Sequence, residues 1–285
     1  MNGEVERMPL RLSPCYQERL WGGGRLKREY CKTDAPPLTA ESWELAARPE
    51  GYCRIADGPL AGKSLMDLCE MDRIAFWGEN CKTEEFPILV KLIDTEKDVS
   101  VQVHPSDMNA LPELGEQGKT EMWYVVDCAP QAAIYYGFSR HMTREEFLCR
   151  AKDGSICETL NRIPIKRGDV FCIMPGTIHA IGAGVLAVEV QQNSITTFRI
   201  YDYSRRDCDG QFRPLHLERA SRVLNYEPVI PDEHKINSMV SFPAFTMTEL
   251  FSCPYFKVYK LDVRTESNLH CDGESFHHLL CVGGC

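Results

Sequence analysis

The feature that most constrains the fold is a series of short segments rich in β-branched and aromatic residues. Residues 86–95 (FPILVKLIDT) and 98–105 (DVSVQVHP) show the pattern, with Asp, Lys and Pro between or beside them. Similar segments are found at 41–47, 121–128, 132–138, 163–176, 179–192, 196–204, 245–252, 255–263 and 277–282. Many short strands spaced by turn-forming residues predict a mainly β sandwich or barrel.

Helical segments interrupt this series. Ser64 precedes residues 65–78, which have the apolar spacing of a capped helix ending at a glycine. Residues 143–162 begin with Thr-x-x-Glu, a capping box, and predict a second helix. A short helix is expected over residues 215–225. We therefore expect a mainly β fold with helical excursions.

Composition excludes several classes of protein. A formal net charge of −9 argues against a general nucleic-acid binder, which needs a basic face. No run of about 18 apolar residues is present, which excludes a membrane-spanning helix. The first residues lack an apolar signal-peptide region, so we expect a cytoplasmic protein. The 14 cysteines form no CxxC pair and are expected to be reduced thiols.

Five polar residues stand out against the β background. Gln102 and His104 lie two apart on one expected strand, so their side chains share a face. Lys119 and Glu121 repeat the pattern, and His179 follows a Pro-Gly turn. Nitrogen and oxygen donors of this kind suit zinc, and also Fe(II), Mn(II) or Co(II). A lone strand histidine is more often structural, but the joint pattern resembles the two histidine motifs of cupins, β-barrels that hold one metal inside.

Longer blocks resemble the type I mannose-6-phosphate isomerases, especially their short form. The resemblance extends over nearly all of residues 9–220. Its blocks, in the family's order, are ERLWGGGRLK, ESWELAARPEG, FPILVKLIDTEKDVSVQVHPSD, GKTEMWYVV, KRGDVFCIMPGTIHAIGAGVLAVEVQQNS and TTFRIYDYSR.

This resemblance implies a jelly-roll cupin that interconverts mannose 6-phosphate and fructose 6-phosphate through a cis-enediol, with one zinc per chain. The implied zinc ligands are Gln102, His104, Glu121 and His179. The implied catalytic residues are Arg199, Lys119 and Glu189, with Ser100 and Lys91 close to the sugar phosphate. The implied partner is a hexose 6-phosphate, with no nucleic acid or membrane, and the chain is expected to be a monomer or a weak homo-oligomer.

Several assignments of the catalytic roles are compatible with the sequence. Lys119 and Glu189 are both candidates for the proton shuttle between C2 and C1. Arg199, with its fixed fork of donors, suits either the phosphate or the enediolate. Glu189 lies in an apolar strand, where a carboxylate without a partner would be costly.

The sequence departs from the family in three places. The turn before His179 reads Met174-Pro175-Gly176, with the proline displaced by one position. Ile195 stands where the family usually has Asp, and the chain ends before the family's last strands. We therefore expect a metal-binding catalytic lobe over residues 1–225 and a truncated second cupin lobe over residues 226–285.

Two other functions are compatible with these residues. A catalytically impaired sugar-phosphate-binding or regulatory cupin would keep the zinc site and lose turnover, and Ile195 and the short C-terminus favour it. A metal-dependent cupin dioxygenase is a more distant alternative. Intact Lys119, Glu189 and Arg199 favour the isomerase.

Overall fold

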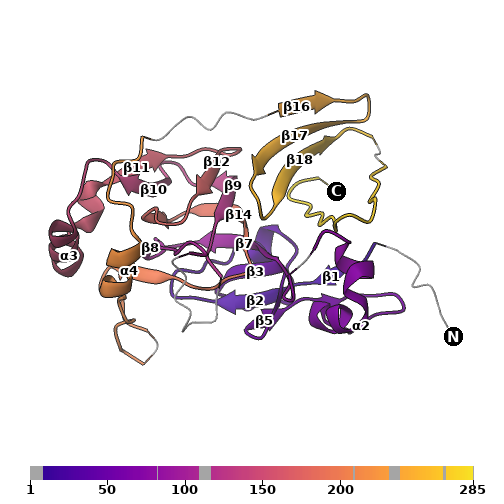
Figure 1. Cartoon of the computed structure of the whole chain (residues 1–285), viewed down its shortest axis with the longest axis horizontal. Helices are drawn as coiled ribbons and strands as arrows, with labels where there is room; N and C mark the ends of the chain where they lie inside the picture. The colour runs from indigo at the N-terminus through magenta and orange to yellow at the C-terminus, as the bar shows by residue number, and fades with distance from the viewer. Residues whose placement is uncertain are drawn as a thin grey trace.

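Two antiparallel sheets dominate the computed structural model, which describes residues 9–81, 83–108, 117–207, 209–230, 238–265 and 268–284 (Figure 1). The six-stranded sheet has the order β12 (Val170–Ile173), β9 (Glu121–Cys128), β14 (Val185–Gln192), β7 (Ile88–Thr95), β3 (Thr39–Leu45) and β2 (Cys15–Glu18). The five-stranded sheet has the order β11 (Leu160–Pro164), β10 (Ala133–Phe138), β13 (His179–Ile181), β8 (Val101–Val103) and β15 (Phe198–Tyr201). The mainly β prediction is confirmed, and the described strand pairings keep the two sheets separate instead of closing a barrel.

Apolar side chains fill three layers around these sheets. Ile93 and Ala187 of the six-stranded sheet pack with Ile134 and Ile181 of the five-stranded sheet in the layer between them. A second layer lies between the five-stranded sheet and helices α3 (Arg144–Asp153) and α4 (Leu217–Val223). The third covers the six-stranded sheet from outside. Because both faces of the sheet are covered, all eight residues of β7 and of β14 are buried.

The expected helices form, and capping residues set the boundaries of two of them, α2 and α3. Ser64 caps α2 (Leu65–Trp77) by accepting from the Asp67 amide at 3.0 Å, and Asp67 accepts from the Ser64 amide at 2.6 Å. The backbone of α2 leaves helical geometry at Asp72. The helix expected over residues 143–162 is shorter, because Gly154 adopts a left-handed conformation that ends α3. A 3₁₀ turn (Ile156–Thr159) and β11 follow.

Several short elements complete the first part of the chain. They are β1 (Leu12–Ser13), α1 (Arg25–Glu29), β4 (Ala47–Arg48), β5 (Gly51–Tyr52) and β6 (Arg54–Ile55). No helix in the described part of the chain has the length and apolar character needed to cross a membrane. The 12 cysteines in that part are free thiols.

The C-terminal region forms a separate three-stranded sheet of β16 (Ser238–Ser241), β17 (Phe245–Ser252) and β18 (Lys257–Val263). Figure 1 shows it, in yellow, beside the six-stranded sheet. Phe256 and Phe251 belong to the same apolar cluster as Leu92 and Leu186, so this sheet shares a core with the six-stranded one. It lies wholly within residues 226–285, and the division into two lobes at residue 225 stays a prediction.

The strand predicted over residues 277–282 is wrong. Phe276, Leu280 and Val282 alternate inward against the core, as strand residues would. No neighbouring strand in the described chain forms a ladder with this segment, however, and it is extended without strand pairing. Backbone hydrogen bonds just before it, from Glu79 to Gly273 and from Asn80 to Glu274, hold the segment on the end of α2.

His278 makes the attachment of this segment sensitive to pH. Burial lowers the pKa of its imidazole to about 4, against a weaker opposing effect of a hydrogen bond to the backbone of Glu44. The unfolded chain, with an ordinary histidine pKa of about 6.5, therefore binds a proton that the folded chain excludes. This contribution to stability is complete above about pH 6.5 and is lost as the pH falls toward 4.

We expect His278→Gln to remove that pH dependence. The free energy of unfolding of the wild-type protein minus that of the variant should shrink between about pH 7 and pH 4.5. Urea denaturation of metal-free protein at each pH measures it, and the other histidines contribute equally to both proteins. A difference that stays constant across this range would contradict the assignment.

Candidate active site and metal centre

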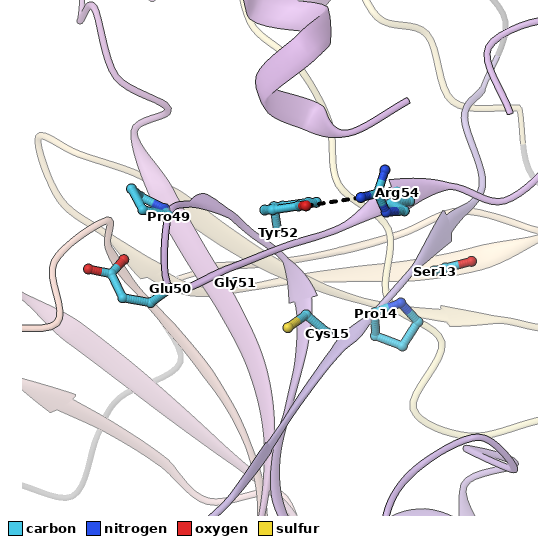
Figure 2. Close-up of a pocket in the computed structure, with 8 residues that line it drawn as sticks. All are labelled: Ser13, Pro14, Cys15, Pro49, Glu50, Gly51, Tyr52 and Arg54. Atoms are coloured by element: carbon cyan, nitrogen blue, oxygen red, sulfur yellow. Dashed lines mark hydrogen bonds between the residues drawn. The ribbon is translucent and has the colours of Figure 1, made fainter. Parts of the chain in front are cut away.

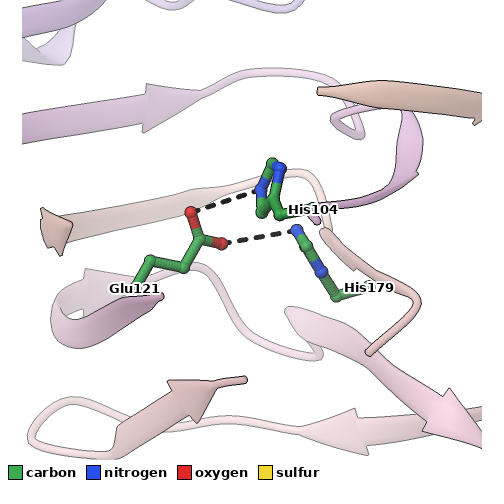
Figure 3. A group of neighbouring side chains, drawn as sticks. All are labelled: His104, Glu121 and His179. Atoms are coloured by element: carbon green, nitrogen blue, oxygen red, sulfur yellow. Dashed lines mark ion pairs between the residues drawn. The ribbon is translucent and has the colours of Figure 1, made fainter. Parts of the chain in front are cut away.

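Three of the predicted metal ligands converge between the two large sheets. His104 follows β8 and His179 begins β13 in the five-stranded sheet, whereas Glu121 begins β9 in the six-stranded sheet. The Nε2 atoms of His104 and His179 lie 3.4 and 3.3 Å from the two carboxylate oxygens of Glu121 (Figure 3). All three side chains are at most 1% exposed. Their donor atoms lie within 4.8 Å of one another, as a metal site requires.

Backbone carbonyls fix the orientation of both imidazoles. The Nδ1 atom of His104 lies 2.9 Å from the carbonyl oxygen of Thr196, and that of His179 lies 2.8 Å from the oxygen of Thr177. Because a carbonyl only accepts, each Nδ1 carries the hydrogen and each Nε2 directs its lone pair toward Glu121. Burial lowers the pKa of His179 to about 3, and burial with the charge of Lys119 lowers the pKa of His104. Both rings are therefore neutral, as metal ligands must be.

The carboxylate of Glu121 is the unusual group in this cluster. Both of its oxygens are buried, and neither has a hydrogen-bond partner in the described chain. Lys119 Nζ lies 2.7 Å from Oε2 as an ion pair. Burial would raise the pKa of Glu121, but the charge of Lys119 outweighs burial and holds that pKa well below its usual range. An ionised carboxylate whose oxygens accept no hydrogen bond in the described chain, facing two imidazole Nε2 atoms, fits a divalent cation.

Gln102, the fourth predicted ligand, lies at the edge of the cluster. In the five-stranded sheet it pairs with His179 on one side and with Arg199 on the other. Its Nε2 atom lies 3.4 Å from Nε2 of His179, and the side chain is half-buried. Its role as a ligand stays a prediction.

Buried charges extend from the cluster across the six-stranded sheet. Lys119 Nζ lies 3.8 Å from Oε1 of Glu189, and Lys91 Nζ lies 2.8 Å from the same oxygen. Glu189 and Lys91 face each other directly across β14 and β7. The carboxylate that looked costly in an apolar strand is thus paired with two lysines.

Three residues of this network were missed from the sequence: Glu41, Trp43 and Trp123. The indole N–H of Trp123 donates to Oε2 of Glu189 at 2.9 Å, and that of Trp43 donates to Oε2 of Glu41 at 2.7 Å. Glu41 Oε2 also lies 3.8 Å from Lys91 Nζ. The sequence pattern that could have identified them is the two-residue spacing along a strand. This spacing places Trp123 on the same face as Glu121 and Trp43 on the same face as Glu41.

The charges of this network stabilise one another. Burial lowers the pKa of Lys91, but Glu189 and Glu41 outweigh it and raise that pKa above its ordinary value. Burial likewise raises the pKa of Glu41, and Lys91 and Arg19 outweigh it, so that the net pKa is lowered. These groups are therefore ionised, which is how buried ions are tolerated.

No hydrogen bond or ion pair within the described chain joins Arg199 or Ser100 to this network. Arg199 Nη1 donates to the carbonyl of Pro214 at 3.0 Å, and burial followed by the charge of Arg213 lowers its pKa. Its Nε atom is buried and has no hydrogen-bond partner among the described residues. Ser100 is buried immediately before β8. Ile195, by contrast, is 41% exposed beside Thr196, the residue that orients His104.

A hollow elsewhere on the surface contains none of the predicted site residues. Figure 2 shows it at the edge formed by β1, β5 and β6, where Arg54 Nη2 donates to the Tyr52 hydroxyl at 2.9 Å. Its lining consists of Ser13, Pro14, Cys15, Pro49, Glu50, Gly51, Tyr52 and Arg54. We assign no chemistry to it.

Comparison with known proteins agrees with this geometry. Residues 9–125 match the model of the phosphomannose isomerase type I catalytic domain. The chain is 40% identical to the mannose-6-phosphate isomerase ManA of Bacillus subtilis, over 92% of this chain and 81% of that protein. It is 36% identical to the mannose-6-phosphate isomerase of Streptococcus mutans, over 90% of this chain and 79% of the relative.

Solved structures agree as well. The crystal structure of the mannose 6-phosphate isomerase from Bacillus subtilis superposes with a TM-score of 0.82 at 37% identity, covering 90% of this chain and 80% of that one. A putative mannosephosphate isomerase from Archaeoglobus fulgidus gives a TM-score of 0.66 at 26% identity, over 86% and 78% of the two chains. With relatives this similar over most of their length, the chain belongs to the type I phosphomannose isomerase family.

Proposed function

We propose that this protein is a zinc-dependent isomerase that interconverts mannose 6-phosphate and fructose 6-phosphate through a cis-enediol. The observation that carries the proposal is the carboxylate of Glu121, which has no hydrogen-bond partner in the described chain and faces two imidazoles fixed in their metal-binding tautomer. Two histidines and one glutamate form a known ligand set of catalytic zinc. Gln102 is the proposed fourth ligand. Bound zinc would act as a Lewis acid toward negative charge that develops on the substrate.

Lys119 is our candidate for the group that moves the proton. The reaction takes a proton from C2 and returns one to C1, so the shuttle must reach both carbons. The Lys119 ammonium borders the metal cluster, 3.4 Å from Nε2 of His104, and also approaches Glu189. Glu189 has both oxygens engaged, one by Lys91 and the other by Trp123. This fixed carboxylate suits a counter-ion that orients Lys119 better than it suits a mobile base.

Arg199 is our candidate for the substrate phosphate. It lies in the same row of the sheet as Gln102 and His179, and its half-buried side chain is more open to solvent than the metal cluster. The Nε atom, unpartnered among the described residues, supports an anion partner, since a buried donor left unpaired is costly. Ser100 and Lys91 stay in the proposal as substrate-binding residues, and the contacts of Lys91 add the task of holding Glu189.

The cellular setting is also proposed. Free thiols at the described cysteines support a reducing cytoplasm. The net charge of −9 supports a protein that does not bind nucleic acid. A monomer or weak homo-oligomer remains our expectation.

The first prediction from this proposed function concerns the metal. Purified protein should contain about one zinc per chain, and a coupled assay should detect turnover of fructose 6-phosphate that a chelator abolishes and zinc restores. His179→Ala should lose both zinc and turnover, whereas His141→Ala, which changes an exposed histidine paired with Glu227, should lose neither. Zinc-loaded wild-type protein without turnover would refute the isomerase and favour a binding-only cupin.

The second prediction separates Lys119 from the metal ligands. Lys119→Met should lower kcat by roughly 10²-fold or more, the usual contribution of a positioned acid–base group. Its zinc content should stay near one per chain, because Lys119 is not a ligand. Exchange of the C2 hydrogen of the substrate with deuterated water should fall in parallel. A variant with kcat within about threefold of wild type would show that another residue shuttles the proton.

The third prediction tests the role of Arg199. Arg199→Lys keeps the charge but removes the fork of donors. If Arg199 binds the phosphate equally in the ground and transition states, KM should rise about tenfold while kcat changes little. Steady-state kinetics decide this, and a loss confined to kcat would instead assign Arg199 to the enediolate.

A further inference from the structure

The carboxylate of Asp107 joins four distant segments of the chain. Its Oδ1 accepts from the Gly118 amide at 2.7 Å and from Nε2 of Gln192 at 3.1 Å. Its Oδ2 accepts a short hydrogen bond from the hydroxyl of Tyr255. These donors outweigh burial and lower the pKa of Asp107, so the group is an ionised acceptor. The loop after His104, the approach to β9, the end of β14 and the C-terminal sheet therefore meet at one side chain.

This junction holds the backbone on both sides of Lys119. The amide of Gly118 donates to Asp107, the amide of Lys119 donates to the Pro105 carbonyl at 3.0 Å, and the amide of Thr120 donates to Oε1 of Gln192 at 2.8 Å. Three consecutive amides thus have acceptors on the segments that also carry His104 and Glu189. Hydrogen bonds from three successive amides fix the position of the backbone from which the Lys119 side chain extends.

The packing at Gly118 is an independent sign of close approach. A Cβ at this position would collide with the backbone of Ser106 and Asp107. The two segments are therefore in direct backbone contact, and Asp107 accepts across that contact.

Tyr255 connects the junction to the C-terminal sheet. It lies in the turn between β17 and β18, 148 residues along the chain from Asp107. Phe256 beside it is buried in the core shared with the six-stranded sheet, which anchors the turn. The anchored turn therefore fixes the backbone that carries the Tyr255 side chain.

We propose that Asp107 is a positioning residue for Lys119, and that the C-terminal sheet acts on the active site through the Tyr255 hydroxyl. The proposal rests on the role given to Lys119 above. In it the C-terminal sheet is part of the catalytic apparatus, because it supplies one of the donors that orient the Asp107 carboxylate. No residue of that sheet needs to touch the substrate.

Tyr255→Phe tests the link, because it removes only the hydroxyl. Tyr259→Phe is the matched control: it lies on β18, its exposure is 43% against 42% for Tyr255, and its hydroxyl has no hydrogen bond within the described chain. Hydrogen–deuterium exchange of peptides containing Gly118–Thr120 should become faster in Tyr255→Phe and not in Tyr259→Phe. Asp107→Ala removes the carboxylate that accepts from Gly118, Gln192 and Tyr255, and it should accelerate exchange further.

Kinetics supply the second readout. Tyr255→Phe should lower kcat about two- to tenfold, the effect of one lost hydrogen bond, with KM and zinc content unchanged. Unchanged exchange at Gly118–Thr120 would overturn the link, and faster exchange with unchanged kcat would overturn the positioning role. If wild-type protein shows no turnover, the isomerase proposal fails, and the exchange comparison still decides whether Tyr255 orders these amides.

Discussion

The buried carboxylate of Glu121 is the group on which the rest of the site depends. An ionised carboxylate is costly to bury unless cations or donors surround it. Lys119 pairs with one oxygen of Glu121 at 2.7 Å, but neither oxygen has a hydrogen-bond partner in the described chain. Two sheets converge on it, one supplying Glu121 and the other both histidines. The carbonyls of Thr177 and Thr196 fix the imidazoles in advance, so only the cation is needed to complete the cluster.

The surrounding charges explain why this cluster suits an anionic substrate. Two lysines, Lys91 and Lys119, are set against three carboxylates, Glu41, Glu121 and Glu189. Arg19, 3.7 Å from Glu41, adds a third cation, so the group is neutral by itself and a divalent cation makes it net positive. The indoles of Trp43 and Trp123 hold the outer carboxylates by hydrogen bonds without adding charge. Metal binding and attraction of a sugar phosphate are thereby coupled through electrostatics.

The prediction of which site residues lie together rests mainly on the alternation of side chains along single strands. Side chains two apart on a strand share a face, so the alternation alone pairs Gln102 with His104 and Lys119 with Glu121. Trp123 and Glu41 followed the same rule but were missed, because their roles depend on β9 and β3 flanking β14 and β7, an order that is not sequential. The strand predicted over residues 277–282 is wrong for a related reason. The side chains do alternate between partly buried and exposed, but no strand of the described chain pairs with this segment. Tyr255 and Asp107 meet only through tertiary packing, which periodicity does not encode.

The X-ray absorption spectrum of the zinc-loaded protein at the zinc edge shows directly which atoms bind the metal. A centre built on His104, Glu121 and His179 should give a shell of nitrogen and oxygen at about 2.0–2.1 Å, with the outer-shell scattering of two imidazoles and no sulfur. With 14 cysteines in the chain, sulfur ligation is a real competitor. A shell containing sulfur at about 2.3 Å, or lacking imidazole, would contradict a metal centre built on His104, Glu121 and His179.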